Sequence, residues 1–209
     1  MIAVNRRQVL ISGAFLWLFA VAGTTLVALT EYSTSAAIVE NEHQLLLRNL
    51  YALLPSDRLD NDIATDTIEL PAAPLLGTDS SSIAYRARRN GEPVAIVFNS
   101  IATNGYSGSI HLLVGVYVDG SLAGVRVVRH SETPGLGDAI ELRKSDWITG
   151  FDGKSLDNPQ SEGWRVKRDG GEFDQLTGAT ITPRAVVRAV HNTLLYYRGN
   201  IDKLFAQVK

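Results

Sequence analysis

A long apolar segment near the N-terminus restricts what this chain can fold into more than any other feature. No charged residue occurs from residue 8 to residue 30, and residues 9–29 are mostly apolar. A helix of about 20 such residues matches the thickness of the hydrocarbon core of a bilayer. The sequence therefore predicts a transmembrane helix over residues 9–30.

The charges on either side of this segment predict its orientation. Arg6 and Arg7 precede it, Glu31 follows it, and all 22 acidic residues of the chain come after residue 30. Because short basic flanks stay on the cytoplasmic side, we expect a short cytoplasmic N-terminus over residues 1–8 and an extracytoplasmic remainder.

A cleaved signal peptide is the alternative to a retained anchor. Ala20-Val21-Ala22 resembles a small-residue cleavage site, and Arg6-Arg7 resembles the start of a twin-arginine export signal. The apolar run nevertheless continues to Leu29, which favours a retained anchor.

The composition of the rest of the chain excludes several kinds of function. A net charge of −2 gives no reason to expect nucleic-acid binding. The absence of cysteine excludes disulfides, iron–sulfur clusters, thiolate zinc sites and c-type haem attachment. An electron carrier here must be an organic cofactor or a haem held without thiols. We expect no metal site, because the four histidines lack the spacing of metal ligands: His43, His111, His130 and His191.

A connecting helix and loop are predicted over residues 31–66, followed by a domain over residues 67–209. Leucines at helical spacing predict a helix over 33–54, which Pro55 ends. Runs rich in β-branched residues, separated by turn residues, then predict strands over 67–70, 83–88, 94–101, 110–118 and 122–130. The sequence thus predicts an α+β fold, in which an antiparallel sheet with flanking helices follows one N-terminal transmembrane helix.

Less regular structure is expected between the last strand and the C-terminus. We predict a short helix over 138–144, a brief strand over 164–168 and a long amphipathic helix over 183–198. Gly199 is expected to end that helix, and a small terminal helix is predicted over 201–208.

The segment 174–183, with the sequence DQLTGATITP, is the clearest candidate site. Thr182 is the predicted N-cap of the last helix, and Pro183 suits its first position. The free N–H groups of a helix start favour a phosphate, and Gly178 lets a ligand approach the backbone closely. On spacing alone, an ordinary capped loop is the simpler interpretation.

Two earlier loops are candidate partners of this segment. The loop 104–108, Asn-Gly-Tyr-Ser-Gly, holds two glycines around Tyr106. The loop 132–137, Glu-Thr-Pro-Gly-Leu-Gly, contains a Pro-Gly turn. Each loop taken alone is explained by turn chemistry.

The three segments together resemble a known family. Thr177-Gly178-Ala179-Thr180, with Asp174 ahead of it, resembles the flavinylation motif of the FMN-binding domain family of Rnf and Nqr redox complexes. The loop 132–137 is similar to the second fingerprint of that family, and the turn at Tyr106 is similar to one next to the flavin. The resemblance covers residues 70–198, and the N-terminal anchor matches the pattern of the G subunits of Rnf (also called Rsx) complexes.

This resemblance implies one FMN, joined through its phosphate to the hydroxyl of Thr180. A flavin transferase would attach it with FAD as the donor. The implied cofactor-binding residues are Asp174, Thr177, Gly178, Ala179 and Thr180, together with Tyr106, Glu132, Thr133, Pro134, Gly135, Leu136 and Gly137 near the ring.

The resemblance also implies a cellular location and a role. A single-pass anchor would attach the domain to the periplasmic face of a bacterial inner membrane. There it would relay electrons with the other Rnf/Rsx subunits between NADH and ferredoxin, coupled to ion translocation. No set of catalytic residues for an independent reaction is evident, so we expect an electron-relay subunit that is not catalytic alone.

Three alternatives stay open on the sequence alone. The first is the C subunit of a sodium-translocating NADH:quinone reductase, which shares the motif. The second is an FMN domain of another extracytoplasmic reductase. The third is a membrane-tethered sensor or binding module without a cofactor.

Overall fold

The computed structural model describes residues 6–205, which fall into two units. The contacts within the chain separate a helical N-terminal unit, up to Leu46, from a compact unit that begins at Leu47. Helix α1 (Arg6–Leu53) supplies the first unit and ends inside the second.

Helix α1 is a single element where two were expected. The sequence predicted a membrane helix over 9–30 and a separate helix over 33–54, but the helix continues without a break. No proline or glycine interrupts residues 30–37, and hydroxyl groups there bond to carbonyls of the preceding turn, as Thr34 Oγ1 does to Thr30 O at 2.8 Å. The polar residues at this position therefore do not break the helix.

The N-terminal part of α1 is long and apolar enough to cross a membrane. Its most apolar window has a mean hydropathy of 2.0 and is not buried against any other described part of the chain. Thr24 donates its hydroxyl proton to Ala20 O at 2.7 Å, so that polar group is satisfied within the helix. One such helix fits a single-pass membrane protein.

A five-stranded antiparallel sheet forms the centre of the compact unit. The strands are β1 (Thr67–Leu70), β2 (Ser82–Arg89), β3 (Glu92–Ala102), β4 (Ile110–Tyr117) and β5 (Leu122–Arg129). They lie in the order of the sequence, each paired with the next. The predicted α+β class and the antiparallel sheet are confirmed.

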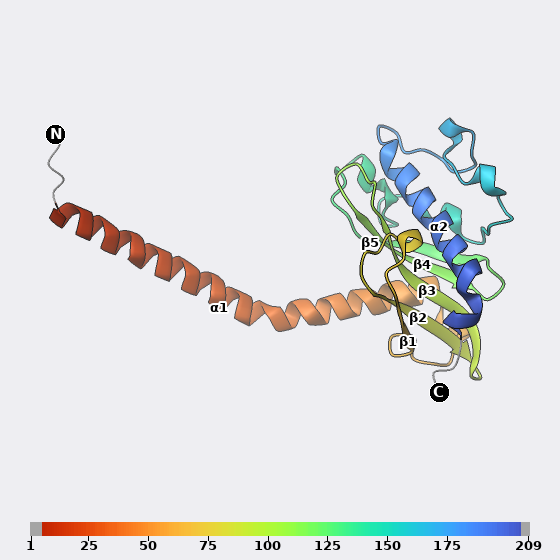
Figure 1. Ribbon diagram of the computed structural model, residues 1–209, viewed down its shortest axis with the longest axis horizontal. Helices are drawn as coiled ribbons and strands as arrows, with labels where there is room; N and C mark the ends of the chain where they lie inside the picture. Colours follow the sequence, from red (N-terminus) through yellow and green to blue (C-terminus); the bar gives the residue numbers. More distant parts are fainter. Residues whose placement is uncertain (1–5, 206–209) are drawn as a thin grey trace. The chain divides into compact units, whose positions relative to one another are not determined.

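Helix α2 (Ile181–Leu204) lies across one face of this sheet (Figure 1). Phe98 of β3 and Val114 of β4 are paired in register, and both point into the core beneath the helix. Phe98 is fully buried and meets Tyr196 of α2 edge to face, with the ring centroids 6.0 Å apart. Side chains on this face hold α2 against the middle of the sheet.

The opposite face of the sheet receives the end of α1. Leu50 and Leu54 are fully buried. A Cβ atom added at Gly115 of β4 would lie 3.7 Å from Leu53 Cβ. Arg126 of β5 donates to Ala52 O at 3.1 Å, at the carbonyl end of the helix, where a cation is favourable. The sheet is thus covered on both faces.

Residues 130–180 contain turns and short 3₁₀ helices instead of regular elements. The helix predicted over 138–144 is a single 3₁₀ turn, Gly137–Ile140, because Glu141 takes an extended conformation. The strand predicted over 164–168 is wrong: Val166 makes one isolated bridge to Phe173 between two 3₁₀ turns. This segment is held by the rings of Phe151, Trp164 and Phe173 instead of a β-ladder; the centroids of Phe151 and Phe173 are 4.7 Å apart.

The last helix is longer than the sequence predicted. It runs through Gly199 to Leu204, so that glycine does not end it. Leu204 is almost fully buried, and its burial outweighs the roughly 1 kcal/mol that a glycine costs inside a helix. The terminal helix predicted over 201–208 is, as far as Leu204, part of α2; residues 206–208 lie outside the described part of the chain.

Candidate functional site

Thr180 occupies the N-cap position of α2, a place that the sequence assigned to Thr182. Its backbone is near-helical, and its side chain makes no capping hydrogen bond. The side chain is half-buried. The hydroxyl of Thr180 therefore lies at the N-terminus of a 24-residue helix, but it does not cap that helix.

Thr182 lies inside the first turn and is fully buried. Its hydroxyl donates to Glu132 Oε2 at 2.5 Å. The other carboxylate oxygen of Glu132 accepts the backbone N–H of Ser107 at 3.0 Å. One buried carboxylate thus joins the loop after β3, the loop after β5 and the start of α2.

Two glycines leave room for this carboxylate. A Cβ atom at Gly137 would lie 2.7 Å from Glu132 Oε2 and 3.0 Å from Thr182 Oγ1. A Cβ atom at Gly105 would lie 2.8 Å from Glu132 Oε1. Contacts below 3.0 Å cannot be accommodated without movement, so these positions require glycine for lack of space.

The loop 132–137 also contacts the segment that carries Thr180. A Cβ atom at Gly178 would lie 2.8 Å from Leu136 Cδ2, and Gly178 has a φ of +78°, which favours glycine. Inside the loop, Asp138 accepts the N–H of Gly135 at 2.7 Å, which fixes the Pro134-Gly135 turn. The structure therefore brings together the three loops that the sequence singled out.

A histidine fixes the start of the loop 132–137. His130 Nδ1 accepts the N–H of Glu132 at 3.0 Å, which leaves the proton on Nε2, opposite Glu141 at 2.8 Å. Hydrogen bonds from Arg143, and secondarily from His130, hold the pKa of Glu141 below its ordinary value. His130 therefore has a structural role in this loop.

The remaining predicted site residues are more exposed. Thr133, Pro134, Leu136, Thr177 and Gly178 are exposed, and Ala179 is half-buried. Tyr106 is 69% exposed on its loop. Asp174 is also exposed; Lys167 Nζ lies 2.6 Å from its carboxylate, and Trp147 Nε1 donates to its carbonyl at 2.6 Å. Glu132 differs from all of these, because its carboxylate is buried and fully engaged with protein groups.

Positive charge collects next to Thr180. Arg168 Nη1 lies 3.5 Å from Thr180 Oγ1. Arg184, one turn into α2, makes two hydrogen bonds to the carboxylate of Asp169, at 2.6 and 2.5 Å. Those bonds hold the pKa of Asp169 below its ordinary value, with smaller contributions from Arg168 and Arg165. Sequence reasoning missed Arg168, because no motif marks a residue 12 positions ahead of Thr180.

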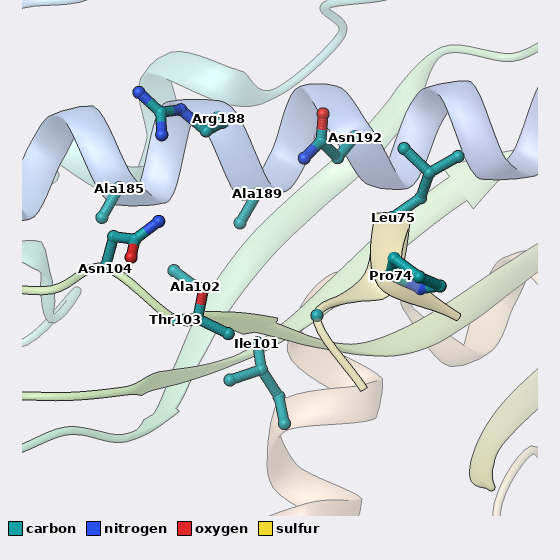
Figure 2. A pocket seen from close by; sticks show the side chains of 11 residues that line it. Pro74, Leu75, Ile101, Ala102, Thr103, Asn104, Ala185, Arg188, Ala189 and Asn192 are labelled. Atoms are coloured by element: carbon teal, nitrogen blue, oxygen red, sulfur yellow. The ribbon is translucent and has the colours of Figure 1, made fainter. Parts of the chain in front are cut away.

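A small pocket lies beside the loop that carries Tyr106 (Figure 2). In the close-up, Arg188 and Asn192 extend from α2 on one side and Asn104 lies on the other, with Ala185 and Ala189 between them. Its volume is about 90 Å³. Pockets for drug-sized ligands have about 300–1,000 Å³, so this pocket suits a few water molecules and not a flavin ring.

A larger hollow of about 340 Å³ flanks α2 at Arg184. Its lining combines charged groups with aromatic rings: Arg165, Arg184, Arg188, Asp169, Trp164 and His191 contribute to it. Since Thr180 and Arg184 are four residues apart, they lie on one side of the helix start. Three arginines against one aspartate give this side positive charge, which suits an anionic ligand.

Comparison with known families assigns the class of this domain. A family model described as the FMN-binding domain matches residues 105–195, and a model of the RnfG N-terminal region matches residues 1–53. The first match includes nearly all of the three loops and most of α2. The second covers the whole of α1.

Curated relatives match almost the whole chain. The G subunit of the ion-translocating oxidoreductase complex from Pseudomonas aeruginosa (strain UCBPP-PA14) is 50% identical over 204 residues, covering 98% of this chain and 95% of that protein. The proteins of the same name from Pseudoalteromonas atlantica and Shewanella loihica are 48% and 45% identical, covering 93% and 95% of this chain and 91% and 94% of theirs. The chain belongs to this family of G subunits.

The residues near Thr180 fit the FMN that the domain family implies. A hydroxyl that is not used as a cap, a guanidinium 3.5 Å from it and a helix N-terminus suit a phosphate. Leu136 and Ile181 expose 43% and 46% of their surface in the adjoining loop and helix start, and Tyr106 projects from the third loop. Exposed apolar side chains around a cationic point suit a flat ring attached to a phosphate.

Proposed function

We propose that this chain is the electron-relay subunit of a membrane-bound, ion-translocating NADH/ferredoxin oxidoreductase. In this proposal it carries one FMN, linked through a phosphoester to Thr180. The match to the FMN-binding domain and the names of the relatives support an electron-transport subunit. The attachment is proposed from the motif and the geometry.

The surroundings of the three neighbouring threonine hydroxyls carry the proposal. Thr182 is fully buried, and its hydroxyl is used by Glu132. Thr177 is exposed and lies before the glycine turn, away from the helix start. Of the three, Thr180 combines the N-cap position with a guanidinium next to its hydroxyl.

A phosphoester suits the expected redox role. The bond holds the phosphate, while the isoalloxazine ring supplies the redox chemistry when FMN is bound. The protein contributes position and electrostatics. A covalent link also prevents loss of the cofactor by dissociation outside the cytoplasm.

Location and partners follow from α1. We propose a single-pass protein of the bacterial inner membrane with its C-terminal domain in the periplasm, because Arg6 and Arg7 precede the apolar run. Its partners would be the other Rnf/Rsx subunits and a flavin transferase that uses FAD. The C subunit of the sodium-translocating NADH:quinone reductase is a less well supported identity, because the match over residues 1–53 is to an RnfG region.

Substitution of Thr180 tests the attachment. Full-length Thr180→Val, co-produced with the flavin transferase, should lose all flavin fluorescence in a denaturing gel and show no added FMN mass. Its stability should change by less than about 1 kcal/mol, because the Thr180 side chain makes no capping bond. Thr177→Val is the matched control and should keep the flavin. Acid-stable flavin on Thr180→Val would refute the attachment site.

A further inference from the structure

We infer that Arg168 holds the phosphate of the attached FMN and thereby fixes the flavin on the domain. This inference rests on the proposed attachment to Thr180. No sequence motif marks Arg168. Three features single it out: its contact with Thr180 Oγ1, its positive charge, and the hydrogen bonds that fix the turn on which it lies.

Arg168 is not committed to a carboxylate. Its neighbour Lys167 is paired with Asp174 at 2.6 Å, and Arg184 is paired with Asp169. Within residues 6–205, no carboxylate lies within ion-pair distance of Arg168, and its hydrogen-bond partner is Thr180 Oγ1. The guanidinium is therefore free to receive an anion at the atom that the proposal esterifies.

The turn that carries Arg168 is fixed on both sides. The N–H of Lys167 donates to Phe173 O at 2.7 Å, and the N–H of Gly171 donates to Val166 O at 3.1 Å. The adjacent Asp169 is tied to Arg184 in the first turn of α2 by two hydrogen bonds. Because the backbone bonds close the turn and Asp169 ties it to the helix that follows Thr180, the backbone that carries Arg168 is positioned before any ligand arrives.

The chemistry of a phosphodiester suits this arrangement. When Thr180 is esterified, its oxygen bears a phosphorus with two non-bridging oxygens that share one negative charge. A guanidinium has a planar fork of donors that matches such oxygens in a bidentate manner. An arginine that contacts the hydroxyl beforehand can therefore contact the phosphate afterwards with little rearrangement.

Arg168→Gln, with Arg89→Gln as the matched control, tests the inference. Each variant removes one exposed positive charge, but only Arg168 contacts Thr180, whereas Arg89 lies at the end of β2. Full-length protein in detergent is incubated with purified flavin transferase and FAD, and the gain of FMN mass is followed with time. The fluorescence anisotropy of the attached flavin is then measured.

Arg168→Gln should slow the mass gain about tenfold or lower the anisotropy clearly, whereas Arg89→Gln should change the rate by less than about twofold. Arg168→Lys should keep part of the wild-type rate, since lysine keeps the charge but lacks the planar fork of donors. Equal behaviour of Arg168→Gln and Arg89→Gln in both measurements would refute the role of Arg168 alone. Wild-type protein that gains no mass would instead refute the proposed function.

Discussion

The two halves of the compact unit are built on different principles. Residues 67–129 form a sheet in which each strand pairs with the next, and backbone hydrogen bonds set the register. Residues 130–180 contain only 3₁₀ turns and loops, which are held by buried rings and by side-chain hydrogen bonds such as that from Thr182 to Glu132. The candidate site lies almost entirely in the second half, against the start of α2.

The sheet half is therefore expected to determine mainly the stability of the domain, and the loop half mainly the geometry of the candidate site. The sheet is stabilised by a large shared apolar core, whereas the loops depend on a few specific hydrogen bonds and close contacts. A substitution under α2 should therefore affect the whole domain, and one at the loops should affect the flavin more than the fold. Three measurements test this distinction.

The largest effect is expected at Phe98, in the sheet half. Phe98→Ala removes a fully buried ring that contacts Tyr196 and Tyr197, so the free energy of unfolding should fall by about 3–5 kcal/mol. Urea denaturation followed by tryptophan fluorescence measures it. Phe15→Ala, at a position 58% exposed on α1, should leave the stability of the domain unchanged. A loss below about 1 kcal/mol for Phe98→Ala would mean that α2 is not packed there.

An intermediate effect is expected at Gly137, in the loop half. In Gly137→Ala the new methyl group would meet Glu132 and Thr182 within 3.0 Å, so stability should fall by about 1–3 kcal/mol. Because the displaced groups join the loops, attachment of FMN should fall as well. Gly150→Ala is the control, since no heavy atom lies within 4 Å of its Cβ position. Identical stability and flavin content in the two variants would show that the loops are not interlocked.

The smallest effect concerns His191 of α2, whose ring stacks on that of Trp164 in the loop half, with the centroids 5.3 Å apart. Burial, and then Arg198, lower the pKa of His191. The unfolded chain therefore takes up this proton at a higher pH than the folded one, so stability should decline as the pH falls below about 6.5. His191→Phe keeps the stacked ring and should reduce the decline between about pH 7 and pH 5, whereas His43→Phe should not. An unchanged pH dependence in His191→Phe would exclude this histidine as a cause.

The sheet could be predicted from the sequence because its signals are local. Alternating apolar residues and the Asp119-Gly120 turn gave β4 and β5 to within one residue, since the period of two places every second side chain on one face. The N-terminal helix could be predicted for the same reason, because its apolar segment is also a local signal. The break expected in α1 and the end expected at Gly199 were wrong, because local signals were outweighed by continuous helical bonding and by the burial of Leu204.

The site could be predicted only in part. Three short motifs identified the loops that meet at α2. They did not distinguish the residues that hold these loops together from the residues that are exposed around Thr180. Glu132 was predicted to lie beside the flavin ring, and the motif did not predict that its buried carboxylate binds Thr182 and Ser107. Arg168 was missed altogether. Glu132 and Arg168 each make contacts with other segments of the chain, and spacing along the sequence does not reveal such contacts.

The hydrogen bond between Thr182 and Glu132 spans 50 positions of the chain, so it forms only when distant segments have folded together. Under the proposed function and orientation, a polypeptide still crossing the membrane would have neither this bond nor the turn that brings Arg168 beside Thr180. Thr180 would acquire its surroundings only when the last helix docks on the sheet. Maturation would then proceed from export to folding and end with attachment of the cofactor, and the modifying enzyme would recognise a folded surface instead of a linear peptide.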